Sequence, residues 1–142
     1  MSVYLDASAL LPWLVEESAS AAIRHYIAAH PQERLISDFA AAEVASALSR
    51  LVRMGLLTGT EGSARLTDFD AWRAATGSSA DLHASDARLA YAYVRRFDLR
   101  LRAPDALHLA IARRLDATLV TLDQRLARAA AELGIAVTVP TA

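Results

Sequence analysis

Four carboxylates occupy positions where they can act together, at the ends of expected strands or in the first turns of expected helices. Asp6 comes directly after the apolar run "VYL", and Asp123 comes directly after "ATLVTL". Because the carboxyl ends of parallel strands lie at one edge of a sheet, both side chains are expected at that edge. Glu43 lies in the second turn of a helix that follows another strand, and Asp105 lies in the first turn of a further helix. All four side chains can therefore converge on one rim.

Such a cluster needs a counter-charge. Two carboxylates repel each other by about 4 kcal/mol at 4 Å and an effective dielectric constant of 20, and helix N-termini offset only part of this repulsion. The cluster therefore requires a cation or raised pKa values. Since the chain has no Cys and no His motif at ligand spacing, all-oxygen ligands favour a hard ion, Mg²⁺ or Mn²⁺. The chemistry that follows is metal-assisted hydrolysis of a phosphodiester, in which the ion activates a water molecule.

Each acid taken alone also has a structural explanation. Asp6 and Asp123 can be helix N-caps, worth roughly 0.5–2 kcal/mol each, and Asp105 can complement a helix dipole for about 0.3–1 kcal/mol. Glu43 is not at the capping-box position of its helix, and it either faces a pocket or lies on a solvated helix face. Only the joint pattern of the four acids favours a metal site.

The composition limits the classes of protein that this chain can belong to. Its 142 residues, 54% hydrophobic and 22% charged, are expected to form a single domain over residues 1–142. No Cys and no Lys are present, which excludes thiol nucleophiles, Schiff-base catalysis and a P-loop. The net charge of −1 argues against a broad electrostatic contact with nucleic acid, although small arginine patches remain possible. Without a membrane span or signal peptide, a cytoplasmic protein is expected.

Strand and helix patterns alternate along the chain. This alternation predicts an α/β fold, a three-layer α/β/α sandwich with a parallel sheet of about five strands. A helix is expected to begin with Pro104 in its first position, and one helix is expected within residues 55–81. The strands are expected at residues 2–5, 34–37, 117–122 and 135–139, and the other helices at residues 8–14, 18–29, 38–54, 85–97 and 123–133.

The four acids lie within motifs that resemble those of PIN-domain ribonucleases, and most of all the VapC-type toxins of type II toxin–antitoxin systems. These motifs are "YLDASALL", "AAAEVASAL", "LRAPDALHLAIA" and "LVTLDQRL". They occur in the order found in the family and span nearly the whole chain. Residues 55–83 match no motif of the family, so the resemblance implies no preference for a particular RNA.

The resemblance implies a fold, an activity and a set of site residues. The implied fold is a parallel sheet of about five strands between helices, and the implied activity is Mg²⁺-dependent RNA cleavage, with Mn²⁺ as a possible substitute. It also implies a cognate VapB-type antitoxin and a homodimer. Matched by position, the acidic metal site consists of Asp6, Glu43, Asp105 and Asp123, and the accessory hydroxyls are Ser8 and Thr121.

Some further polar residues have weaker indications of a role. Arg102 is close enough in sequence to Asp105 to be a candidate phosphate contact. His108 shares a helix face with Asp105 and is expected to be hydrogen-bonded and partly buried. The other histidines are expected at the surface, whereas Trp13 and Trp72 are expected in the core or at a dimer contact.

Two alternatives remain open. A non-catalytic PIN-like domain would keep the acids but bind RNA or protein. A haloacid-dehalogenase-like phosphatase also places an Asp after its first strand, but its motif requires a second Asp where this chain has Ser8, and it requires a Lys. The nuclease hypothesis predicts 5′-phosphate and 3′-hydroxyl ends, because a water molecule and not the ribose hydroxyl attacks the phosphorus.

Overall fold

A five-stranded parallel sheet forms the centre of the protein. The structure is a computed structural model that describes residues 2–76 and 78–141. Its strands lie in the order β3-β2-β1-β4-β5, so β1 is central, between β2 and β4. All the strand pairs are parallel, which confirms the predicted α/β class. The strands are β1 (Val3–Leu5), β2 (Arg34–Ser37), β3 (Ser79–Ala80), β4 (Thr118–Val120) and β5 (Val137–Thr138).

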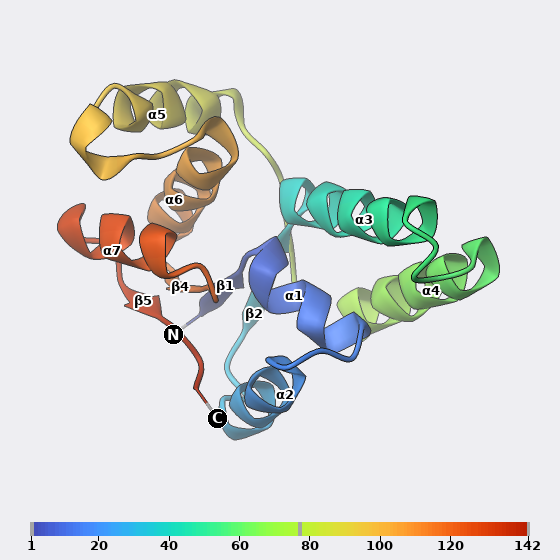
Figure 1. Ribbon diagram of the computed structural model, residues 1–142. Coiled ribbons are helices and arrows are strands. Elements are labelled where there is room, and N and C mark those ends of the chain that lie inside the picture. The colour runs from blue at the N-terminus through green and yellow to red at the C-terminus, as the bar shows by residue number, and fades with distance from the viewer. Residues whose placement is uncertain (1, 77, 142) are drawn as a thin grey trace.

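Helices cover both faces of this sheet. In Figure 1, one layer lies to the left of the strands and consists of α5 (Ala84–Val94), α6 (Ala103–Leu115) and α7 (Gln124–Glu132). The other layer lies to the right and below, and consists of α1 (Ala7–Leu14), α2 (Ser20–Ala29), α3 (Asp38–Arg53) and α4 (Gly59–Thr76). A short 3₁₀ helix, η1 (Phe97–Leu99), links α5 to α6. None of the helices within the described ranges has the length and apolarity to cross a bilayer.

The alternation of side chains along the strands divides the core into two parts. Val3 and Leu5 pack with α1, α2, α3 and α4 on one face of the sheet. Tyr4 points to the opposite face and packs with α5, α6 and α7. This division follows from the two-residue period of a strand, and it gives the three layers expected from the sequence. The central strand is held on both sides, so the residue that follows it is placed rigidly.

Several local predictions differ from the structure. The predicted strand 135–139 is shorter, since β5 covers only Val137–Thr138, and the helix predicted over residues 85–97 ends at Val94. The short edge strand β3 was not predicted, because two residues carry no detectable alternation. Helix α6 begins at Ala103, so Pro104 occupies the second helical position and not the first. The predicted strand 117–122 is shorter in the structure, since β4 covers only Thr118–Val120. The residues after Val120 leave the strand because their polar groups bond to the beginnings of α1 and α7.

Candidate active site

Asp6 and Asp123 emerge at the same edge of the sheet, as predicted. Asp6 follows β1 and is the N-cap of α1, where its Oδ1 accepts the backbone N–H of Ala9 at 3.0 Å. Asp123 follows the neighbouring strand β4 by three residues and is the N-cap of α7. Both carboxylates therefore cap a helix, which is the structural role that either one could have without a metal site. A capping role does not exclude a second one, because one carboxylate carries about four acceptor positions.

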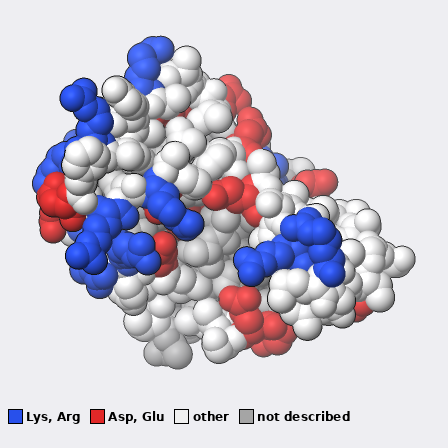
Figure 2. Space-filling view, turned by 45° about the horizontal axis from the view of Figure 1, so that its top comes forward, with Lys and Arg blue, Asp and Glu red and all other residues white. Residues whose placement is uncertain are grey.

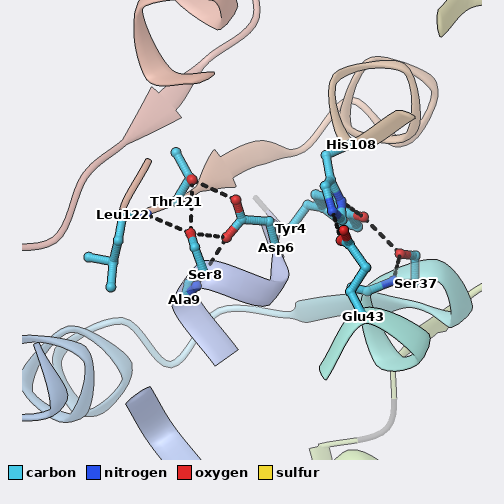
Figure 3. Close-up of polar contacts among 10 residues, drawn as sticks. Tyr4, Asp6, Ser8, Ala9, Ser37, Glu43, His108, Thr121 and Leu122 are labelled. Atoms are coloured by element: carbon cyan, nitrogen blue, oxygen red, sulfur yellow. Dashed lines mark hydrogen bonds and ion pairs between the residues drawn. The ribbon is translucent and has the colours of Figure 1, made fainter. Parts of the chain in front are cut away.

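The Asp6 carboxylate is buried among hydroxyl groups. It is only 3% exposed. Ser8 Oγ donates to its Oδ1 at 2.7 Å, and Thr121 Oγ1 donates to its Oδ2 at 2.5 Å. Ser8 Oγ in turn accepts the N–H of Leu122 at 3.0 Å, and Thr121 Oγ1 accepts the N–H of Asp123 at 3.1 Å. Figure 3 shows the bonds among Asp6, Ser8, Thr121 and Leu122, which tie the end of β1 to the segment after β4 and fix the orientation of Asp6.

Burial makes the charge on Asp6 costly. Loss of water contact raises the pKa of this carboxyl group above its ordinary value, and the hydroxyl bonds from Thr121 and Ser8 oppose that rise. Within the described part of the chain, no arginine forms a salt bridge with Asp6. A buried carboxylate with hydrogen-bond donors but no positive side chain paired to it is electrostatically suited to a bound cation.

Glu43 belongs to a second hydrogen-bonded chain, beside the first (Figure 3). Its Oε1 pairs with Nε2 of the buried His108. His108 Nδ1 lies 2.7 Å from the hydroxyl of Tyr4, which lies 2.7 Å from Ser37 Oγ. Ser37 caps α3 by accepting the N–H of Ala40. Glu43 is therefore not on a freely solvated face, because a chain of hydrogen bonds through α6, β1 and β2 reaches its carboxylate. Burial raises the pKa of Tyr4, which stays a neutral hydroxyl.

Asp105 and Arg102 lie at the start of α6. Asp105 Oδ2 accepts the backbone N–H of Arg102 at 3.3 Å, and it lies 3.9 Å from Arg102 Nε. The Arg102 side chain is 80% exposed, so it can reach a ligand. Asp105 stands one turn before His108 on the same helix face, as its spacing predicted. This places Asp105 beside the Glu43 chain of hydrogen bonds.

The four acids share one edge, but their carboxylates do not form a closed cluster. Figure 3 shows the carboxylate of Asp6 facing Ser8 and Thr121, while that of Glu43 faces His108. Among the residues that the structure describes, no three acidic or His side chains are close enough together to form a ready-made metal site. The four acids nevertheless supply carboxylate oxygens, which are ligands that Mg²⁺ prefers, and one of them is a buried charge. In chemical type, the residues fit a hard divalent cation.

Two features of this region were missed by sequence reasoning. Tyr4 and Ser37 were not recognised as partners of His108, because residues on different strands show no sequence relation. Asp86 was not predicted to be buried, but it is buried and receives two bonds from Arg114, at 2.8 and 3.0 Å. The signal that could have found it is helical spacing, since Asp86 lies four residues before Ala90 and seven before Tyr93, on the buried face of α5. The predicted core role of Trp13 and Trp72 is confirmed, since their rings are 5.3 Å apart and pack against the core.

The comparison with protein families identifies the class. The model of the PIN domain matches residues 3–132, so the chain belongs to the PIN-domain family. Among curated proteins, it is 35% identical to ribonuclease VapC46 of Mycobacterium tuberculosis, over 99% of this chain and 98% of that protein. These findings confirm the prediction of a PIN-domain nuclease of the VapC type.

Solved structures share the fold. FitAcB from Neisseria gonorrhoeae has a TM-score of 0.73 at 17% identity, covering 96% of each chain. VapBC2 from Rickettsia felis, bound to a DNA fragment from its promoter, has a TM-score of 0.74 at 13% identity, covering 99% of this chain and 100% of that one. At these identities the similarity establishes the shared fold.

Proposed function

We propose that this protein is the endoribonuclease toxin of a toxin–antitoxin pair and that Asp6, Glu43, Asp105 and Asp123 form its Mg²⁺-dependent active site. The observation that carries the proposal is Asp6. A buried carboxylate at the tip of the central strand, oriented by Ser8 and Thr121 and without a paired arginine, destabilises the metal-free fold. Such a group is expected where a bound ligand offsets that cost, and for a PIN-domain protein the expected ligand is the divalent cation used in RNA cleavage.

The residues divide the work of binding and orientation. Asp6, Asp105 and Asp123 would hold the cation, and Glu43 would bind it or accept a proton from the attacking water. A divalent cation at this place supplies positive charge to the phosphodiester oxygens and makes water easier to deprotonate. Ser8 and Thr121 keep both oxygens of Asp6 in one orientation. Exposed Arg102 would contact a phosphate of the RNA strand.

RNA cleavage tests this proposal directly. A labelled RNA mixture is incubated with the protein and Mg²⁺, with the protein and EDTA, and with the Asp6→Asn variant and Mg²⁺. Cleavage is expected only in the first reaction, with Mn²⁺ able to replace Mg²⁺ and with 5′-phosphate and 3′-hydroxyl ends. Products with 2′,3′-cyclic phosphate, or cleavage that persists with EDTA and in the variant, would contradict the assignment.

The partners follow from the same class of protein. The similarity to VapBC2 and to ribonuclease VapC46 supports a cognate antitoxin that blocks the acidic edge, and the family resemblance supports a homodimer in the cytoplasm. Co-expression of the protein with the product of a neighbouring small reading frame should yield a stable complex without RNase activity. A non-catalytic binding domain is the remaining alternative, and it predicts that RNA is bound and left intact under every one of these conditions.

A further inference from the structure

Three arginines line one cavity beside α7. Arg100, Arg125 and Arg128 surround a space of about 250 Å³ between η1 and α7. All three are exposed, and within the described residues none of them has a salt bridge or a side-chain hydrogen bond. The other charged residues of the cavity, Asp98 and Glu132, both lie near Arg96. The cavity therefore keeps a surplus of positive charge.

The fold brings these arginines together from two separate segments. Arg125 and Arg128 are three residues apart in α7, so they lie on the same face of that helix. Arg100 comes from the connection between α5 and α6, where its backbone has a left-handed conformation with φ of 56°. A residue other than glycine adopts this conformation at a cost, and such residues are concentrated at ligand sites.

Both walls of the cavity are close in sequence to acids of the carboxyl edge. Arg125 is two residues beyond Asp123, and Arg100 is five residues before Asp105. Figure 2 shows arginine side chains on both sides of a hollow that carries acidic side chains. If the scissile phosphate of an RNA strand lies at the acids, the neighbouring phosphates of that strand lie over one of the two arginine-bearing sides. Guanidinium groups suit that role, because their planar N–H donors match phosphate oxygens.

We propose that Arg100, Arg125 and Arg128 form a phosphate subsite that binds the backbone of the RNA strand next to the bond that is cut. The proposal rests on the proposed ribonuclease function. It assigns the cavity a single ligand, a phosphodiester group, and it gives a reason for three unpaired arginines in a chain whose net charge is −1. An acidic segment of a protein partner is the competing occupant, and the experiment includes it.

Binding is measured without cleavage, in the Asp6→Asn background with Mg²⁺ present, by fluorescence anisotropy with a single-stranded RNA. The Arg125→Gln/Arg128→Gln variant and the Arg100→Gln variant alter opposite walls of the cavity, so a folding defect in α7 cannot explain a loss in both. Arg24→Gln, on α2 at the far end of the molecule in Figure 1, is the control for net charge. Each lost arginine is expected to weaken RNA binding on the order of tenfold. The salt slope, the dependence of log affinity on log salt concentration, should fall by about 0.7 per lost phosphate contact.

A second measurement identifies the ligand as one particular phosphate. RNAs with a single uncharged methylphosphonate linkage, placed at each position in turn, are bound to the parent protein and to Arg100→Gln. One linkage should weaken binding to the parent but not to the variant, because that variant has already lost the contact. If no linkage behaves in this way, or if the variants match Arg24→Gln, the subsite is refuted.

The outcomes separate the two proposals. If the wild-type protein fails to cleave RNA but the variants still lose RNA affinity, the nuclease assignment falls, and the cavity is a site for the RNA backbone with no cleaved bond beside it. If RNA is cleaved and bound normally by the variants, the nuclease assignment stands and the subsite falls. If the variants bind RNA normally but lose affinity for a polyglutamate peptide, the cavity is a site for an acidic protein segment and the proposal is wrong.

Discussion

Replacing Thr121 by Val tests whether hydroxyl groups sustain the buried charge of Asp6. Thr121 is fully buried, and its Oγ1 donates to Asp6 Oδ2 at 2.5 Å while accepting the N–H of Asp123 at 3.1 Å. Valine has nearly the same shape but no hydroxyl. The Thr121→Val variant therefore leaves one carboxylate oxygen and one backbone donor with fewer partners.

The expected cost is the sum of the two lost bonds. A hydrogen bond to a charged group contributes about 1.5–3 kcal/mol, and a neutral one contributes about 1 kcal/mol. The free energy of unfolding at pH 8 should thus fall by about 2.5–4 kcal/mol. Because the lost bond favours the ionised form, the variant raises the pKa of Asp6 further above its ordinary value. At pH 4.5 more of Asp6 is protonated than at pH 8, so the loss should be smaller there.

Urea unfolding of the metal-free protein, in EDTA at both pH values, measures these differences. Thr121→Ser is the matched control, since it keeps the hydroxyl and removes one methyl group. Its cost should be about 1 kcal/mol and nearly independent of pH. An equal loss for Thr121→Val at both pH values, or equal losses for the Val and Ser variants, would show that packing and not the bond to Asp6 is responsible.

Three further outcomes are expected. Asp6→Asn should lose RNA cleavage, yet at pH 8 it should unfold at a higher urea concentration than the wild type. The raised pKa of Asp6 costs the wild type stability increasingly as the pH rises above about 4. The stability advantage of the variant should therefore disappear when the urea titration is repeated near pH 4. Tyr4→Phe removes the hydroxyl between His108 and Ser37, and chemical denaturation should show a loss of about 1–3 kcal/mol. Arg114→Met leaves the 2% exposed Asp86 unpaired and should cost about 3–5 kcal/mol at pH 7 without changing the rate of RNA cleavage per folded molecule. Burial raises the pKa of Asp86, but the bonds from Arg114 and the His83 N–H bring it below its ordinary value. The loss in Arg114→Met should therefore diminish as the pH falls and Asp86 in the variant becomes protonated, which a pH series of thermal melts detects.

Local sequence was enough to predict the fold class and the edge at which the acids lie. Strand runs followed by helical runs leave few arrangements other than a parallel sheet with helices on both faces. Once the strands are parallel, a carboxylate directly after a strand must emerge at the carboxyl edge. The positions of Asp6 and Asp123 at that edge were therefore predictable, and so was the common face of Asp105 and His108, which depends only on helix geometry.

The sequence did not determine which groups the acids contact. Thr121 reaches Asp6 across 115 positions and His108 meets Glu43 across 65, so neither contact has a periodic signal. The same limit applies to β3, which is too short to show alternation, and to Arg114, whose pairing with Asp86 depends on how α5 packs against α6.

The sequence by itself determined the residue types at the carboxyl edge, because strand and helix periods act over a few neighbouring residues. The tertiary structure alone decided that the Asp6 carboxylate is buried among hydroxyl groups, that Glu43 is held by His108, and that three arginines line one cavity. The physical reason is that burial and hydrogen bonding depend on distances between segments, and those distances are set only when the helices pack on the sheet.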